Sequence, residues 1–419
     1  MSERVFYCAM IQPDTQSVTS PWLSIIGVGE DGADGLSSAA RALLAQAKLI
    51  IGGARHLALI GDVNAEKLAW PSPLTDALPA LLARRGEPIV VLASGDPFYF
   101  GVGELLSRHV QRHEIFCLPA ASAFALSAAR LKWSQQDCAC LSLHGRAFAR
   151  IIHHLQPRAR IIALSWDETT PAQLASHLTA NGMGASQLHV LERMGGPNER
   201  IRSTSARDFN LSDIAALNTV AIEITADASA RIIPRAAGLP DDWFENDGQL
   251  TKRDIRAITL SALAPRHGEL LWDIGAGAGS VSIEWMLADT SLRAVAIEAH
   301  PDRAARIRRN AAAFGVPGLE VVEGAAPKAL TGLPQPDAIF IGGGAADAGV
   351  LDTAGGSLKS GGRLVANAVT LETEALLIAR HASLGGELIR IAISRASPVG
   401  EKSGWRPAMP VTQWAWVKP

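Results

Sequence analysis

The chain has 419 residues with 39 basic and 41 acidic side chains, which gives a formal net charge of −2 at pH 7. This near-neutral balance leaves no electrostatic footprint for nucleic acid, so we expect no nucleic-acid partner. Because no apolar run is long enough to span a membrane and the N-terminal residues do not resemble a signal peptide, we expect a globular cytoplasmic protein with no membrane partner.

The first half of the chain is expected to alternate strands and helices, beginning with an apolar strand at 23–28. Further strands are expected at 88–93, 139–143, 159–164, 187–191 and 219–224. Their continuous Val, Ile, Leu and Ala content is typical of strands that helices cover on both faces. This pattern predicts an α/β fold.

Four loops of this half each follow an expected strand and precede an expected helix. Because ligands in open α/β sheets bind at the carboxyl ends of strands, we expect these loops to converge on one cleft. Asp96 has two open interpretations, a ligand contact or a Gly-Asp-Pro turn in which the carboxylate binds its own backbone. The loop residues of interest are Gly27, Gly29, Gly95, Asp96, Ala121, Ser122, His144 and Arg146.

The periodicity ends in a turn-rich, acidic stretch at about 234–247. We therefore expect a tail at 1–21, a first domain at 22–236 and a second at 237–419. The second domain opens with Thr251 and Asp254 at the spacing of a capping box, ahead of a helix that ends near Leu263.

A strand, a glycine turn and a helix follow, with the sequence Asp-Ile-Gly-Ala-Gly-Ala-Gly at 273–279. Such glycines let the chain turn sharply and bring backbone N–H groups to a helix N-terminus. The next expected strand ends in Glu298, 19 residues after Gly279, where a carboxylate can bind ribose hydroxyls. The pattern predicts a nucleoside pocket.

The glycine spacing favours one kind of nucleoside over another. A nicotinamide fingerprint needs its third glycine at position 280, where this chain has Ser280. Asp-x-Gly-x-Gly-x-Gly is the form associated with S-adenosylmethionine, and the strands expected near 336–342 and 358–367 fit strands four and five of a class I methyltransferase. A dehydrogenase and a turn-only role for the glycines remain as alternatives.

The four cysteines are Cys8, Cys117, Cys138 and Cys140. They form no Cys-x-x-Cys pair, and no histidine lies nearby at ligand spacing. We therefore expect reduced thiols, no disulfide framework and no metal site.

The first half resembles the tetrapyrrole (precorrin) methylase family in its segments 27–32, 93–101, 118–123 and 141–146. The second half resembles the decarboxylating precorrin methyltransferases in its segments 238–244, 250–257, 272–280, 324–330, 340–344 and 365–372. The resemblance implies a two-lobed tetrapyrrole-methylase α/β fold followed by a class I, Rossmann-like doubly wound sheet. One departure is Glu30-Asp31, which replaces the Pro-Gly of many tetrapyrrole methylases and leaves open a non-catalytic first domain.

The resemblance also implies a reaction. It is the S-adenosylmethionine-dependent methylation of precorrin-6B at carbons 5 and 15 with loss of the ring C acetate carboxyl group, which gives precorrin-8X in cobalamin biosynthesis. One methyl donor per domain, a tetrapyrrole substrate and a homo-oligomer are implied, whereas methylation of RNA or another substrate is the alternative. By the family's pattern, the cofactor contacts are Gly27, Gly29, Gly95, Asp96, Ala121, Ser122, Thr251, Gly275, Ala276, Gly277, Ala278, Gly279, Glu298 and Ala325.

The implied chemistry needs few reactive side chains. Transfer of a methyl group from a sulfonium is an in-line displacement, so the protein mainly positions the substrate and excludes water. The substrate's carboxylates call for cationic or polar partners. The candidates are Lys252, Arg253, Asn367, His144 and Arg146.

Arg256 lies with Lys252 and Arg253 on an expected helix whose first turn could face the cleft, and a solvated basic face is the alternative for all three. A solvent-exposed helix face is expected for Arg303, Arg306, Arg308 and Arg309, and surface positions for His153 and His154.

Overall fold

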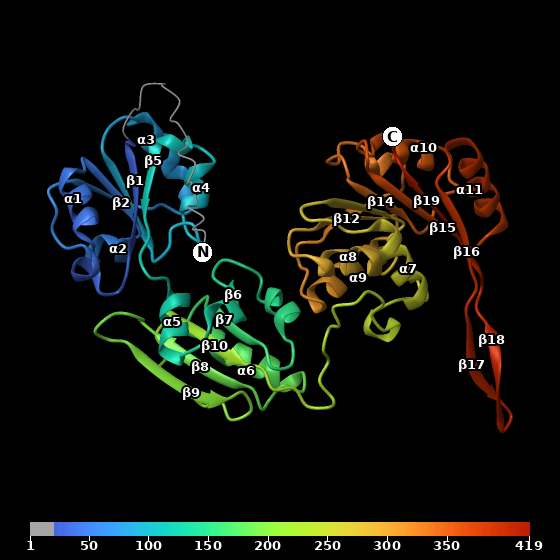
Figure 1. Cartoon of the computed structure of the whole chain (residues 1–419), viewed down its shortest axis with the longest axis horizontal. Helices are drawn as coiled ribbons and strands as arrows, with labels where there is room; N and C mark the ends of the chain where they lie inside the picture. Colours follow the sequence, from blue (N-terminus) through green and yellow to red (C-terminus); the bar gives the residue numbers. More distant parts are fainter. Residues whose placement is uncertain (1–20) are drawn as a thin grey trace, which may run out of the picture. The chain divides into compact units, whose positions relative to one another are not determined.

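The computed structural model describes residues 21–419, which divide into two compact units (Figure 1). The first unit contains the described residues up to His144 together with Arg160–Thr225, and the second contains Gly145–Ala159 and Ala226–Pro419. The expected tail, apart from residue 21, and Cys8 lie outside the described residues. Between residues 21 and 419, the chain forms no helix with the length and apolar character needed to cross a membrane.

The first lobe of the first unit is a five-stranded parallel sheet in the order β3-β2-β4-β1-β5. Its strands are β1 (Leu23–Val28), β2 (Leu49–Gly52), β3 (Glu66–Ala69), β4 (Ile89–Ser94) and β5 (Ile115–Leu118). Its helices are α1 (Ser38–Gln46), α2 (Ala54–Leu59), α3 (Leu78–Ala83) and α4 (Gly103–Ser107). Every residue of β1 is buried, because apolar clusters pack on both faces of the sheet.

The second lobe is a mixed sheet of five strands in the order β6-β7-β10-β8-β9. Its strands are β6 (Cys138–Ser142), β7 (Arg160–Leu164), β8 (Gln187–Glu192), β9 (Arg200–Ser205) and β10 (Asn218–Glu223). Two helices accompany it, α5 (Ala123–Leu131) and α6 (Thr170–Ala180). The strands expected in this half from the sequence are confirmed to within about one residue.

The second unit is built on a seven-stranded sheet in the order β13-β12-β11-β14-β15-β19-β16. The strands are β11 (Leu270–Ile274), β12 (Arg293–Glu298), β13 (Glu320–Glu323), β14 (Ala338–Ile341), β15 (Arg363–Ala368), β16 (Glu387–Ile391) and β19 (Val411–Val417). The first five strands in this order, which are β13, β12, β11, β14 and β15, are parallel to one another. Strand β19 runs antiparallel to its neighbours β15 and β16. The strand order reverses beside β11, which is the switch point where such sheets bind ligands.

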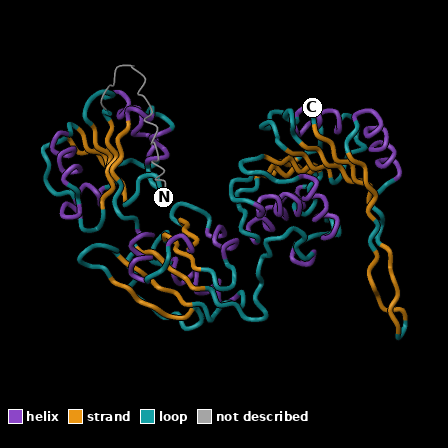
Figure 2. The backbone as a smooth tube through the Cα atoms, viewed as in Figure 1, coloured by secondary structure: helices purple, strands orange, loops and turns teal. Residues whose placement is uncertain are grey.

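Helices cover both faces of this sheet, as the doubly wound prediction required (Figure 1). One face carries α7 (Arg253–Leu263), α8 (Ser280–Ala288) and α9 (Pro301–Ala313). The other carries α10 (Val350–Ser357) and α11 (Leu371–Leu384). Between β16 and β19 the chain forms a hairpin of β17 (Ser394–Val399) and β18 (Lys402–Pro407), which extends beyond the sheet (Figure 2).

The expected capping box at Thr251 is wrong. Helix α7 begins at Arg253, its N-cap residue is Lys252, and no side chain caps it. The Arg256 guanidinium instead donates to the carbonyl oxygen of Thr251 and pairs with the buried carboxylate of Glu284. Neither interpretation of Arg256, a cleft contact or a solvated face, is correct, because its side chain is fully buried, does not line the cavity of this unit and joins the segment before α7 to α8.

Candidate active site

The turn between β11 and α8 is a backbone cradle. Gly275 and Gly277 have φ values of +71° and +60°, which side-chain-bearing residues rarely adopt. A Cβ on Gly275 would lie 2.8 Å from the carbonyl oxygen of Gly343, and one on Gly277 would lie 2.8 Å from that of Gln249. Glycine is therefore required here both by conformation and by the close approach of neighbouring backbone.

Glu298, at the end of β12, faces this turn. Its carboxylate accepts hydrogen bonds from the backbone N–H groups of Gly277 (2.8 Å) and His300 (3.0 Å). It is 4% exposed and forms no salt bridge within residues 21–419. Each carboxylate oxygen keeps a free lone pair after one such bond, so the group can also accept from a ligand's hydroxyls.

Asp273 is buried beneath the same turn. One of its carboxylate oxygens accepts from the backbone N–H (3.1 Å) and the hydroxyl (2.6 Å) of Ser282, while the other has no hydrogen-bond partner among residues 21–419. Burial raises the pKa of Asp273 to about 6, with a smaller contribution from the Glu298 charge, although the Ser282 hydrogen bonds oppose the shift. The side chain joins the end of β11 to the first turn of α8.

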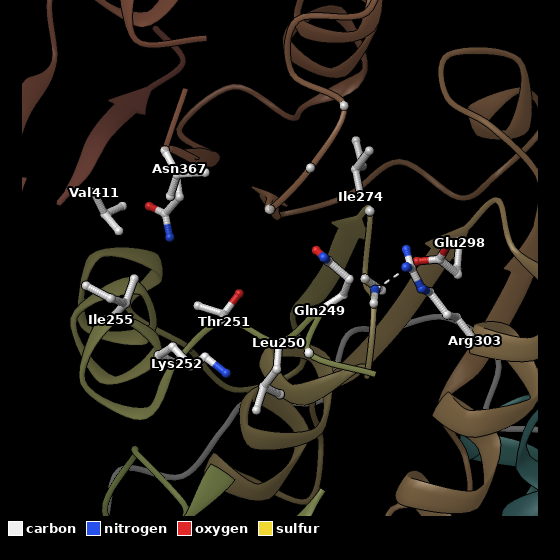
Figure 3. Close-up of a pocket in the computed structure, with 18 of the residues that line it drawn as sticks. Gln249, Leu250, Thr251, Lys252, Ile255, Ile274, Glu298, Arg303, Asn367 and Val411 are labelled. Atoms are coloured by element: carbon white, nitrogen blue, oxygen red, sulfur yellow. Dashed lines mark hydrogen bonds between the residues drawn. The ribbon is translucent and has the colours of Figure 1, made fainter. Parts of the chain in front are cut away.

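A cavity of about 580 Å³ opens at the carboxyl ends of β11, β12, β14 and β15 (Figure 3). Glu298 and Arg303 lie at one end, and Ile255, Asn367 and Val411 lie at the other. The lining combines backbone and the glycine turn with apolar side chains, some of which lie at the base of the hairpin. A volume of this size suits a small-molecule site.

Most of the expected contacts of the second domain line this cavity. They are Thr251, Lys252, Gly275, Ala276, Gly277, Glu298, Ala325 and Asn367. Ala278 and Gly279 lie behind the turn, where Ala278 is fully buried and its carbonyl oxygen accepts from the Asn310 side chain. Arg253 is exposed on α7 and is not among the lining residues.

Asn367 is held in a fixed orientation. Its amide nitrogen donates to the Thr259 hydroxyl (2.9 Å), and its amide oxygen accepts from the side-chain nitrogen of Gln413 (2.9 Å). Lys252 has no side-chain hydrogen bond or ion pair within the described part of the chain. Its ammonium group can therefore bind a ligand without first losing a partner.

The sequence did not single out two cations of this cavity. Arg303 was expected on a solvent-exposed face, but it lines the cavity and pairs with Asp247 (2.8 Å). Arg306 pairs with the same carboxylate (3.1 Å), so the exposed position expected for it is also wrong, because the segment around residue 247 folds back onto α9. Arg395, at the start of the hairpin, lines the cavity and pairs with Asp254.

These pairs affect acid–base behaviour as well as position. Hydrogen bonds from Arg303 and then Arg306 hold the pKa of Asp247 well below its usual range. Arg308 and Arg309 are about half exposed and pair with Glu323 and Glu245. The solvent-exposed position that the sequence predicted is therefore confirmed for Arg308 and Arg309.

In the first unit, the backbones of three expected loops, at Gly27, Gly95 and Ser122, lie in close contact. A Cβ on Gly27 would collide with the carbonyl oxygen of Gly95, and one on Gly95 would lie 2.7 Å from the Cα of Ser122. Beside them is a cavity of about 80 Å³ whose lining includes Gly29, Gly95 and Ala121. Three of the four expected loops therefore converge, whereas His144 and Arg146 of the fourth loop do not line this cavity.

Several other residues that the sequence placed at a ligand site form hydrogen bonds or ring contacts within the protein. The Asp96 carboxylate accepts from the backbone N–H of Phe98 (2.9 Å), which is the turn interpretation, and the Ser122 hydroxyl caps α5 (3.2 Å). His144 is exposed, with its ring 5.9 Å from that of Trp166, and Arg146 is exposed in the second unit.

His153 and His154 are half-buried in a 3-10 helix at Phe148–His154. Burial lowers the pKa of both imidazoles, with smaller effects from the charges of Arg235 and His153 respectively. The surface position expected for these histidines is therefore wrong.

The second unit is a class I methyltransferase. Three features define it: a parallel sheet in which β19 lies antiparallel between β15 and β16, the glycine turn after β11, and the carboxylate of Glu298 at the end of β12. Residues 242–418 match the family described as "Precorrin methyltransferase domain", and residues 23–210 match "Tetrapyrrole (Corrin/Porphyrin) Methylases". A Sinorhizobium sp protein named "Precorrin-6Y C(5,15)-methyltransferase [decarboxylating]" is 56% identical over 96% of this chain and 98% of its own length. The chain therefore belongs to the precorrin-6Y C(5,15)-methyltransferase (decarboxylating) family.

Two proteins of Salmonella typhimurium each resemble part of the chain. One, named "Cobalt-precorrin-7 C(5)-methyltransferase", is 29% identical over 47% of this chain and 98% of its own length. The other, named "Cobalt-precorrin-6B C(15)-methyltransferase (decarboxylating)", is 34% identical over 39% of this chain and 85% of its own length. These families are methylases that use S-adenosylmethionine as the methyl donor, so membership favours methyl transfer over the dehydrogenase alternative.

Proposed function

We propose that the chain methylates precorrin-6B at carbons 5 and 15 and removes the carboxyl group of the ring C acetate, giving precorrin-8X. The observation that carries the proposal is the cavity of the second unit, in which a glycine cradle and Glu298 adjoin an apolar chamber. The similarity to the Sinorhizobium protein over nearly the full length of both chains supports it. We place the two activities in domains at 22–236 and 237–419 and expect the enzyme to act in the cytoplasm.

The backbone-lined end of the cavity suits the methyl donor. Glu298 can accept hydrogen bonds from ribose hydroxyls, while the open backbone at Gly275 and Gly277 leaves room for the amino-acid part of the donor. S-adenosylmethionine, when bound, supplies an electrophilic methyl group on a sulfonium. The remaining task of the protein is to hold a ring carbon in line with that group and to exclude water.

The other end suits a flat, carboxylate-rich macrocycle. Ile255, Ile391 and Val411 offer apolar surface, and Asn367 offers a polar group of fixed orientation. Lys252 and Arg395 offer positive charge for substrate carboxylates, where a charge-assisted hydrogen bond contributes about 1.5–3 kcal/mol. Decarboxylation can then proceed by electron flow into the conjugated macrocycle, which the substrate itself supplies.

We assign methylation at carbon 15 and the decarboxylation to the second unit, and methylation at carbon 5 to the first. The motifs of the second half are those of the decarboxylating precorrin methyltransferases, and the decarboxylating Salmonella relative acts, by its name, on carbon 15. The names of the two Salmonella proteins also indicate the order, since one acts on the 6B and the other on the later 7 intermediate. The second unit thus acts before the first.

We further propose one methyl-donor site per unit and self-association of the chain. The first-unit loops at Gly27, Gly29 and Gly95 form the second donor site in this proposal. Trp405 and Val399, which are 78% and 64% exposed on the hairpin, support a contact with another copy.

Calorimetry with the full chain tests the donor assignment. We expect S-adenosylmethionine to bind with two sites per chain and NAD not to bind. NAD binding, or the absence of any S-adenosylmethionine binding, would overturn the proposed function. A single S-adenosylmethionine site would overturn the assignment of a donor to each unit.

A further inference from the structure

Two arginines from different lobes line the cavity of the first unit, and neither belongs to the family's motifs as described above. Arg55 lies at the start of α2, just beyond the carboxyl end of β2. Arg193 follows the last residue of β8 in the second lobe. The same cavity is lined by Gly29, Gly95 and Ala121, the residues expected to contact the methyl donor.

Arg55 is held in place from several directions. Its guanidinium forms an ion pair with Glu30 and donates to the Ser94 hydroxyl (3.1 Å) and to Nε2 of His56 (3.0 Å). His56 acts as an acceptor here, because burial and the Arg55 charge lower its pKa to about 4 and keep it neutral at pH 7. The Arg55 side chain nevertheless stays 40% exposed, so a fixed cation borders the cavity.

Glu30 thereby gains a role that the sequence did not reveal. It stands at the position where many tetrapyrrole methylases have proline, and its carboxylate positions Arg55. A Cβ on Gly196 would lie 2.7 Å from the Cβ of Glu30, so the turn that follows Arg193 packs directly against Glu30. Glu30 therefore contacts both Arg55 and the turn that follows Arg193.

Arg193 has an unfavourable backbone conformation. Its φ is +49°, in the left-handed region, which is unfavourable for a residue with a side chain. Hydrogen bonds fix this geometry, from its own N–H to the Leu217 carbonyl (3.1 Å) and from the Gly196 N–H to its carbonyl (3.2 Å). Glycine would satisfy the turn without strain, so the backbone does not explain the choice of arginine.

The side chain of Arg193 is free to bind. It is exposed and has no ion pair or side-chain hydrogen bond within residues 21–419. With Glu30 offsetting Arg55, the cavity lining keeps one uncompensated positive charge. Since guanidinium groups bind carboxylates with paired hydrogen bonds, the cavity is suited to one additional carboxylate.

We propose that Arg193, together with the positioned Arg55, binds a carboxylate of the tetrapyrrole substrate in the first unit; the inference rests on the proposed function. A carboxylate also occurs in the amino-acid part of the methyl donor, which is the other source of this chemistry. The substrate is favoured because Arg193 comes from the second lobe, whereas the expected donor loops at Gly29 and Gly95 belong to the first.

The experiment uses the full chain with precorrin-6B and S-adenosylmethionine, with products separated by mass. The variants are Arg193→Gln, which removes the charge, Arg193→Lys, which keeps it, and Arg193→Gly, which removes both the charge and the backbone strain. Arg112→Gln is the matched control, because Arg112 is exposed in a 3-10 helix of the first unit and does not line the cavity.

We expect Arg193→Gln and Arg193→Gly to accumulate the decarboxylated, singly methylated intermediate, with the KM of the second methylation for that intermediate raised about 10- to 100-fold. Arg193→Lys should recover part of this loss, and Arg112→Gln should match the unmodified chain. The melting temperature of Arg193→Gly should be unchanged or higher, which a structural role for the arginine would not produce. Donor affinity should not change in any variant.

Three outcomes would overturn the inference. A normal KM in Arg193→Gln would remove the residue from the site, weakened donor binding would assign it to the donor, and a lower melting temperature in Arg193→Gly would make its role structural. Failure of the unmodified chain to decarboxylate or methylate precorrin-6B would instead overturn the proposed function. The decarboxylation by the second unit serves as an internal measure of folding and activity in every variant.

Discussion

The carboxylate of Glu298 accepts a hydrogen bond from the backbone N–H of Gly277, with 2.8 Å between the nitrogen and Oε2. The bond joins the end of β12 to the glycine turn after β11, so one side chain both shapes the cradle and faces the cavity. The sequence predicted a nucleoside pocket from the glycine turn and Glu298, and the structure places these two features in contact.

Glu298→Ala should weaken donor binding at one of the two proposed sites by about 10- to 100-fold, because one or two hydrogen bonds to ribose are lost. Glu323→Ala is the matched control, since Glu323 lies opposite Glu298 in the register of β12 and β13 but is exposed and paired with Arg308. Titration calorimetry measures both. Equal donor affinity in the two variants would exclude Glu298 from the donor site.

Gly277→Ala should abolish donor binding in the second unit and cost about 1–2 kcal/mol of stability, because φ is +60° and the new Cβ would press on the Gln249 carbonyl. Gly361→Ala provides the comparison, since φ is +74° there but, apart from its two chain neighbours, no described residue has an atom within 4 Å of the added Cβ. That control should lose a similar stability and keep its activity. Retained C15 methylation in Gly277→Ala would contradict the assignment of the cradle.

Asp273→Asn should change the pH dependence of stability. Because the folded-state pKa of Asp273 is raised to about 6 from an ordinary 3.8, ionisation opposes folding, fully above pH 6 and progressively less as the pH falls toward 4. The unfolding free energy of the variant minus that of the unmodified chain should therefore rise by up to about 3 kcal/mol between pH 4 and 7. Urea unfolding at both pH values measures this difference, and a constant difference would show that Asp273 does not titrate in this range.

Arg256→Met should destabilise the second unit by about 3–5 kcal/mol, because it leaves the buried carboxylate of Glu284 without its cationic partner. Arg309→Met, which removes an exposed pair with Glu245, should cost no more than about 1 kcal/mol. Adding Glu284→Met to Arg256→Met should restore part of the loss. Equal costs for the two single variants, measured by denaturant unfolding, would contradict the structural role given to Arg256.

The strands that were predicted are short, continuous apolar runs such as β1 and β4, whereas β3 and β9 are largely exposed and were not predicted. The run at 23–28 is β1 without any shift, and the approach of the glycine turn to Glu298 followed from their spacing along the sequence. Both signals are local, so a single sequence carries them.

The errors at Arg303 and Arg256 have a common physical cause, which is pairing between distant segments. Arg303 pairs with Asp247 and Arg256 with Glu284, and neither partner could be identified from spacing along one helix. The hairpin at Ser394–Val399 and Lys402–Pro407 is exposed on most of its length, so it lacks the apolar alternation that predicts strands. Arg55 and Arg193 are single arginines in loops, and only the fold brings them to one cavity.

The most direct test of the proposed function is incubation of the full, unmodified chain with precorrin-6B and S-adenosylmethionine, followed by mass measurement of the product. We expect a product that is heavier by two methylene units and lighter by one carbon dioxide, with a decarboxylated, singly methylated intermediate appearing first. Unaltered precorrin-6B in the presence of bound donor would contradict the assignment.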